Sequence, residues 1–168
     1  MTKRLHCVLT TRDYAMMEDF LDSGAYVGEG VAALARRKLA GAMIVFPDDV
    51  PPDVATVNSR IAFTVGDRPA ETRVLVRDAG HRVSGAALRV DTLRGMALLG
   101  LEADEHVVLE RPDGSSETLR LDAVIHQPEA AARMLAERNV VRLDGRFRRK
   151  AAPVIAGGGD DDPGPHAA

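Results

Sequence analysis

A proline- and aspartate-rich stretch divides this chain into two parts with different periodicities. Residues 47–53 read Pro-Asp-Asp-Val-Pro-Pro-Asp, with three prolines and three aspartates. Because proline lacks a backbone donor and disfavours a helical conformation in the residue before it, no helix continues through this stretch. Apolar residues at helical spacing precede it, and β-branched or alternating runs follow it. We therefore expect a rigid connector between a helical part and a β-rich part.

Two helices are expected before the connector, after a short strand at residues 5–9. Thr10 and Asp13 have the spacing of a capping box, which begins a helix, and Gly24 is the type of residue that ends one. A second helix is expected from about residue 29 to residue 43. Because only about five residues join them, the two helices should form a short antiparallel hairpin.

The part after the connector predicts an α+β fold that is mostly antiparallel. Strand-like runs occupy residues 54–65, 72–76, 85–90, 105–110 and 117–125. Asp113-Gly114, between the last two runs, is a strong hairpin signal. One short helix at residues 92–100, closed by Gly100, interrupts the strands.

Three regions follow from these patterns. Residues 1–48 hold the first strand and the helical hairpin, residues 49–127 hold the β-rich domain, and residues 128–168 hold a short helix and a tail. Proline at position 128 suits the first turn of that helix. The tail has a basic cluster at residues 142–150 and a Gly-, Pro- and Asp-rich end, which is typical of disorder.

Composition and missing motifs exclude several classes of protein. The 168 residues carry 22 Lys+Arg and 25 Asp+Glu, and this net charge of −3 gives no general argument for nucleic-acid binding. A lone cysteine, Cys7, excludes a multi-cysteine zinc site, and the five histidines lack metal-ligand spacing. No membrane-spanning run, nucleotide-binding loop or nucleophile motif is present. We expect a cytoplasmic protein that is not an enzyme, with no catalytic or metal-binding residues, no cofactor and no small-molecule substrate.

The charges on the expected hairpin are polarised. Its acidic tip would contain Glu18, Asp19, Asp22 and Glu29. Residues 36–38, Arg-Arg-Lys, would lie toward its open end. The tip could approach a bound Mg²⁺ or a basic surface, or the charges could match the helix dipoles, which leaves Asp19 and Asp22 unexplained. Helices of about 13 residues span only about 20 Å, so such a tip can plug an entrance but cannot reach far into a channel.

Four segments in register resemble a known family. Residues 47–60, PDDVPPDVATVNSR, resemble the P-x-x-x-P-x-D-V-V-T-M-N-S-R stretch of Rnk-type regulators of nucleoside diphosphate kinase. Residues 95–100, GMALLG, resemble the G-x-A-L-L-G helix of the related GreA/GreB transcript cleavage factors. Residues 110–114 and 124–131 also fit the Rnk-type pattern. The resemblance therefore runs from about residue 5 to residue 131.

The resemblance implies a short helical hairpin followed by an FKBP-like domain that binds RNA polymerase near its secondary channel. In GreA and GreB a longer hairpin carries an acidic tip that promotes cleavage of backtracked RNA. Rnk-type proteins have a shortened hairpin. The resemblance therefore implies a non-enzymatic transcription regulator that competes with cleavage factors, without binding membranes or specific nucleic-acid sequences.

The resemblance also assigns the polymerase contact to the turn before the short helix, formed by Asp91, Thr92, Leu93 and Arg94. The family usually has Ser-Pro where this chain has Thr92 and Leu93, and the missing proline predicts a less rigid turn. Residues 97–99 are expected in the core. Residues 58–60, Asn-Ser-Arg, form either a turn at a strand start or a second contact.

Three alternatives remain open at this point. The acidic tip could support transcript cleavage. The domain could be an FKBP-type prolyl isomerase, although it offers just one aromatic residue, Phe63, with Phe46 at its border. The cluster at residues 142–150 could bind nucleic acid or another protein. The plug interpretation requires the two helices to project outward instead of sharing a core with the domain.

Overall fold

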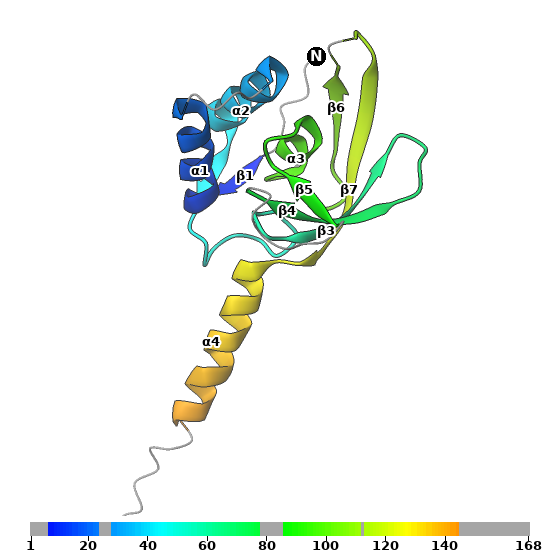
Figure 1. The fold of residues 1–168 in the computed structure, drawn as a ribbon. Coiled ribbons are helices and arrows are strands. Elements are labelled where there is room, and N and C mark those ends of the chain that lie inside the picture. Colours follow the sequence, from blue (N-terminus) through cyan, green and yellow to red (C-terminus); the bar gives the residue numbers. More distant parts are fainter. Residues whose placement is uncertain (1–6, 24–27, 78–85, 112, 145–168) are drawn as a thin grey trace, which may run out of the picture.

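The computed structural model describes residues 7–23, 28–77, 86–111 and 113–144 (Figure 1). In chain order the elements are β1 (Val8–Thr10), α1 (Thr11–Asp22), α2 (Glu29–Gly41), β2 (Met43–Val45), β3 (Arg60–Val65), β4 (Glu71–Val76), β5 (Ala87–Arg89), α3 (Leu93–Leu98), β6 (His106–Glu110), β7 (Ser116–His126) and α4 (Pro128–Asp144). The predicted hairpin turn at 24–27 and the tail after residue 144 lie outside the described residues. Within the described ranges, no helix has the length and apolar character needed to cross a membrane.

The α+β prediction is confirmed by a five-stranded sheet that curls into a half-barrel (Figure 1). Its strand order is β5-β4-β3-β7-β6, and only the β4–β5 pair is parallel. The predicted hairpin at Asp113-Gly114 joins β6 to β7, with Gly114 at φ 81°. Asn58, at φ 68°, lies in a turn in which the amide of Ser59 donates to the carbonyl of Thr56 at 3.0 Å. The interpretation of residues 58–60 as a turn at the start of β3 is therefore confirmed.

A second, two-stranded sheet was not predicted from the sequence. The strand β2 runs parallel to β1, with Val8 opposite Met43 and Thr10 opposite Val45. We predicted a helix through residue 43, but α2 ends at Gly41. The reason is that β1 offers an open backbone edge at that point, and a strand on this edge satisfies both sets of polar groups.

The start of α1 matches half of the predicted capping box. The side chain of Thr10 accepts a hydrogen bond of 3.0 Å from the backbone amide of Asp13. Asp13 itself is buried, and one of its carboxylate oxygens has no hydrogen-bond partner. Burial raises the pKa of Asp13 to about 6, although hydrogen bonds from Thr10 and Val57 act in the opposite direction. The carboxylate of the predicted box therefore belongs to the protein interior.

The apolar faces of α1 and α2 belong to the same core as the sheet. Met17 of α1 and Leu34 of α2 lie in one continuous cluster of buried residues with Leu98 of α3 and Leu121 of β7. The expectation that the helices project outward from the domain is therefore wrong. Helices of only 12 and 13 residues obtain most of their stability from burying an apolar face. The helix α2 packs against α3, and α1 packs against α2, β1 and β2.

A buried lysine joins α2 to α3. Lys38 is 2% exposed, and its ammonium group donates hydrogen bonds to the carbonyl oxygens of Ala97, at 2.7 Å, and Leu99. These carbonyls lie at the end of α3, where no further helical turn provides donors. Burial lowers the pKa of Lys38 to about 8, so its side chain still carries a proton at pH 7. The lysine that we placed in the basic cluster at the open end of the hairpin thus holds two helices together.

The connector is held by the base of α4. Arg133 donates to the carbonyl oxygens of Pro47, Asp48 and Val50 at distances between 2.9 and 3.2 Å. Gln127, which precedes α4, donates to the carbonyls of residues 51 and 54. Beyond this base, α4 extends away from the rest of the protein (Figure 1). The C-terminal helix therefore fixes the segment that leads from the two N-terminal helices into the sheet.

Replacing Lys38 by methionine should destabilise the protein. Lys38→Met keeps the length of the side chain but leaves the carbonyls of Ala97 and Leu99 without their donor. We expect a loss of about 2 kcal/mol in the free energy of unfolding, measured by urea denaturation. Arg37→Met, on the exposed neighbour, is the control and should change stability by less than about 0.5 kcal/mol. Equal effects of the two variants would contradict the importance of the buried contact.

Gly100 should not tolerate a side chain. It has φ 75°, and an added Cβ would lie 2.8 Å from both the Cys7 sulfur and the Val8 carbonyl oxygen. Gly100→Ala should cost about 3 kcal/mol or more, because it adds a clash with β1 to the backbone strain. Gly114 has a similar φ of 81° but open space around the added Cβ. Gly114→Ala therefore measures the backbone strain without a clash and should cost about 1 kcal/mol. Thermal unfolding of both variants tests this difference.

Candidate functional site

The turn of residues 91–94, which the sequence singles out, is tightly folded onto α3. Thr92 caps the helix: its hydroxyl accepts from the amide of Gly95 at 3.2 Å and donates to the carbonyl of Arg89 at 2.7 Å. A Cβ at position 95 would lie only 2.0 Å from that same carbonyl oxygen. Glycine is therefore required there, and hydrogen bonds hold the turn where relatives are expected to have a proline.

The side chains of the turn point in different directions. Asp91 pairs with Arg89 through both carboxylate oxygens, with one contact of 2.8 Å. Leu93 is half-buried against the core, and its side chain lies 4.0 Å from the position that a Cβ on Gly30 of α2 would take. Arg94 points toward the start of β7 instead. The four predicted residues are adjacent in the chain but make separate contacts.

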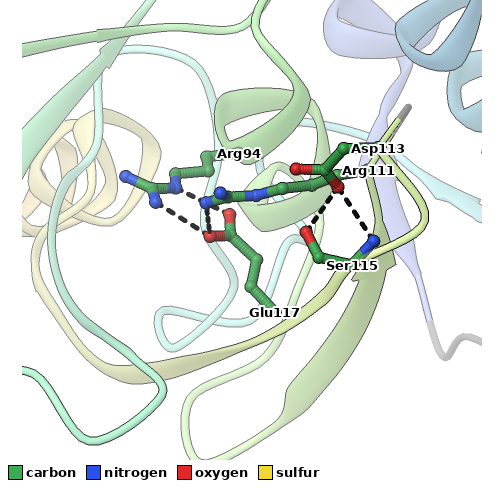
Figure 2. Close-up of polar contacts among 5 residues, drawn as sticks. All are labelled: Arg94, Arg111, Asp113, Ser115 and Glu117. Carbon is green, nitrogen blue, oxygen red and sulfur yellow. Dashed lines mark hydrogen bonds and ion pairs between the residues drawn. The ribbon is translucent and has the colours of Figure 1, made fainter.

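Arg94 and Arg111 share one carboxylate, that of Glu117 (Figure 2). The guanidinium of Arg94 donates to both oxygens of Glu117, at 2.8 and 2.9 Å, and Arg111 donates to one of them. Figure 2 also shows the next residues of the β6–β7 hairpin, where Ser115 donates to the carboxylate of Asp113. The short helix and the hairpin are thus connected beside the turn.

Arg94, Arg111 and Glu117 together carry one positive charge, and the carboxylate of Asp113 also lies near Arg111 (Figure 2). The guanidinium groups of Arg94 and Arg111 hold the pKa of Glu117 at about 2, and the same pairing raises the pKa of Arg94. Glu117 is only 12% exposed, whereas the two arginines are 30% and 39% exposed. The two arginines therefore present donors to solvent in a fixed orientation, an arrangement that suits a carboxylate on a partner protein.

The four acidic residues predicted for the hairpin tip are all exposed: Glu18, Asp19, Asp22 and Glu29. Among the described contacts, no hydrogen bond or ion pair joins their side chains to one another. Within the same part of the chain, no group of three or more His, Cys, Asp or Glu side chains is placed to hold a metal ion. Glu29 lies in the first turn of α2, where it complements the helix dipole.

Neither Phe63 in the sheet domain nor Phe46 at its border is placed as the wall of a pocket for a proline substrate. Phe63 is 2% exposed and belongs to the core, whereas Phe46 is 67% exposed on the connector side. The prolyl isomerase alternative, which the FKBP-like fold implied by the resemblance suggested, therefore gains no aromatic pocket wall from either residue.

Two residues of this site, Arg111 and Glu117, were not predicted from the sequence. Glu117 and Arg111 flank the Asp113-Gly114 turn, so their proximity to each other could have been found from the hairpin. The contact with Arg94 joins residues 23 positions apart and has no local signal. Lys38 did have a signal, because it follows Val31 and Leu34 at helical spacing and so lies on the buried stripe of α2.

The fold defines the class of protein. The structure is similar to a solved structure described as "Prokaryotic transcription elongation factor GreA/GreB" from Nitrosomonas europaea, with a TM-score of 0.56 and 26% sequence identity. The match covers 72% of this chain and 98% of that one. The protein therefore has the GreA/GreB type of architecture, as the motifs at residues 95–100 predicted.

The sequence comparison identifies the family. The "Regulator of nucleoside diphosphate kinase" of Escherichia coli K12 is 32% identical over 125 residues, which cover 74% of this chain and 92% of the relative. The protein of the same description from Shigella flexneri gives the same values. No family model matches the chain. This chain belongs to the family of regulators of nucleoside diphosphate kinase, the Rnk family.

Removing the carboxylate of Glu117 should lower the free energy of unfolding by an amount that depends on pH. The pKa of Glu117 is lower in the folded state than its ordinary value of 4.5, so its stabilising effect is fully present above about pH 4.5 and is lost as the pH falls toward 2. Because its partners are partly solvated, Glu117→Gln should cost about 1–2 kcal/mol at pH 7. Urea denaturation at pH 7 and pH 3 measures this, and the difference from wild type should shrink at the lower pH.

Glu110→Gln is the matched control for that variant. Glu110 is exposed on the neighbouring strand β6, and its substitution should change stability by less than about 0.5 kcal/mol. A pH-independent loss in the Glu117→Gln variant would contradict the role of the carboxylate charge.

Proposed function

We propose that this protein is a non-enzymatic transcription regulator that binds RNA polymerase near the secondary channel and competes there with transcript cleavage factors. The observation that carries the proposal is the combination of Rnk family membership with a fold similar to a solved structure described as a GreA/GreB transcription elongation factor. This combination supports the coarser part of the proposal, a factor that acts on RNA polymerase. The competition is the finer part of the proposal and has its own test below.

The turn at residues 91–94 is the proposed docking surface. Thr92 is exposed, and Asp91 and Arg94 are partly exposed beside it. Each is held by a contact within the protein, to Arg89, Gly95 or Glu117. A surface whose side chains are already ordered loses little conformational entropy on binding, which favours affinity. The half-exposed Arg111 extends this surface onto the β6–β7 hairpin.

The N-terminal helices support competition without cleavage. The helices α1 and α2 contain 12 and 13 residues, so each spans only about 20 Å. They share the core of the domain, and Lys38 ties α2 to α3. Helices held in this way do not project from the domain, so they cannot plug a channel or carry Asp19 and Asp22 deep into it. We therefore propose that the acidic residues do not reach the polymerase active centre.

Binding should be tested by co-purification of the full chain with RNA polymerase core and holoenzyme at micromolar concentrations. Wild type should bind, and Asp91→Arg should weaken binding about tenfold or more, because it replaces the ion pair that orders the turn, between Asp91 and Arg89, by repulsion between two like charges. The melting temperature of the variant reports whether it is folded. Glu137→Arg, an exposed charge reversal on α4, should leave binding unchanged. Absence of wild-type binding to either form of polymerase would refute the proposal.

Two further assays distinguish competition from cleavage. One adds a transcript cleavage factor to the complex of this protein with polymerase, and the other adds this protein to backtracked transcription complexes. The protein should displace the cleavage factor and should not itself promote RNA cleavage. Cleavage by the wild type that is lost in an Asp19→Ala/Asp22→Ala double variant would favour the alternative, in which the acidic tip supports catalysis. Simultaneous binding of both proteins would refute competition while leaving polymerase binding intact.

A further inference from the structure

A small pocket lies between α1 and the sheet domain, next to the turn of residues 91–94. Its volume is about 170 Å³. Its apolar lining consists of Met16, Met17, Phe20, Val90 and Met96. Apolar cavities of about 150 Å³ are large enough for a benzene ring, and methionine side chains adapt their shape to a ligand. The pocket is therefore the size of one aliphatic or aromatic side chain.

The polar part of the lining carries both signs of charge. Asp19 and Ser23 come from the end of α1, and Arg77 directly follows β4. Among the described contacts no ion pair joins Asp19 to Arg77, and both side chains are exposed to solvent. Asp19 is a carboxylate near the C-terminal end of α1, a position that the dipole interpretation did not explain. A ligand with one negative and one positive group would match both residues.

We propose that this pocket binds a free α-amino acid with an apolar side chain, such as leucine, methionine or phenylalanine. The apolar side chain would lie among the methionines, the carboxylate would accept hydrogen bonds from Arg77, and the ammonium group would donate to Asp19 and Ser23. A residue within a peptide chain has neither charged group, so it would leave Asp19 and Arg77 unmatched. A phosphorylated ligand would meet repulsion from Asp19.

Because the pocket lies beside the turn of residues 91–94, a bound ligand would restrict movement of the residues on either side of that turn. Val90 immediately precedes the turn, and Met96 lies on α3 immediately after it. A bound amino acid would contact both of these residues and α1 at once, and so would restrict their relative movement. This consequence rests on the proposed function, whereas binding of the amino acid does not.

Binding is tested on the full chain by isothermal titration calorimetry with L-leucine, L-methionine and L-phenylalanine. We expect dissociation constants between about 10 μM and 1 mM for at least one of them, as is reasonable for so small a ligand. L-leucinamide lacks the carboxylate and isocaproate lacks the ammonium group, and each should bind about tenfold or more weakly than leucine. Absence of binding of all three amino acids at about 10 mM would overturn the proposal.

Two variants assign the charged groups to their roles. Arg77→Gln should weaken leucine binding about tenfold or more and should leave the affinity for leucinamide unchanged. Asp19→Asn should have the corresponding effect on leucine but not on isocaproate. Asp22→Asn, an exposed carboxylate on the same helix outside the pocket lining, should leave leucine binding unchanged. Equal affinity for leucine, leucinamide and isocaproate would show a purely apolar pocket and overturn the zwitterion proposal.

These measurements need no polymerase. A failure of amino-acid binding therefore leaves the proposed function intact, and a failure of polymerase binding leaves the ligand site intact. Where both hold, repeating the polymerase co-purification with and without the bound amino acid measures the coupling between the pocket and the turn.

Discussion

The arrangement of this protein depends on one buried ammonium group. Lys38 reaches from α2 to the last carbonyls of α3, and this contact replaces the donors that the end of a short helix lacks. Burying a charge is costly unless hydrogen bonds compensate for it. The contact is therefore formed only when α2 lies directly on α3. This requirement fixes the N-terminal helices against the sheet domain and, through α3, relates them to the turn at residues 91–94.

The two short N-terminal helices pack on the β-rich domain and do not form a projecting hairpin. In a projecting hairpin the tip would act at a distance from the docking surface. Here Met16 and Met17 of α1 belong to the same buried core as Met96 of α3, the helix that follows the turn. The two N-terminal helices and the β-rich domain therefore share one core, and the surface that they present together is broader than the turn alone.

Much of the fold could be predicted from local sequence signals. The Thr10 cap, the Asp113-Gly114 hairpin and the end of α3 near Gly100 each depend on residues close together in the chain. The strand β2 could not be predicted in this way, because it exists only where β1 provides an open edge. The burial of Asp13 could not be predicted either, because its spacing from Thr10 is the same as that of an ordinary, exposed capping residue.

The candidate site was predictable only in part, for a similar reason. The motif around residues 95–100 located the turn, but its contacts come from other segments of the chain. Arg94 of α3 contacts Glu117 of β7, and the pocket that contains Asp19 and Arg77 joins the end of a helix to the end of a strand. Such pairs appear only when the tertiary structure brings distant residues together.

The anchoring of α4 has a practical consequence for engineering. Arg133 and Gln127 secure the first turns of this helix to the connector, whereas the helix continues to residue 144 beyond them. A fluorophore or affinity label attached near residue 139 would stand roughly 9 Å along the helix axis from Arg133. A truncation after Asn139 should spare the fold, while one before Gln127 would release the connector. The distal part of this helix is thus the natural attachment point for immobilising the protein on a sensor surface.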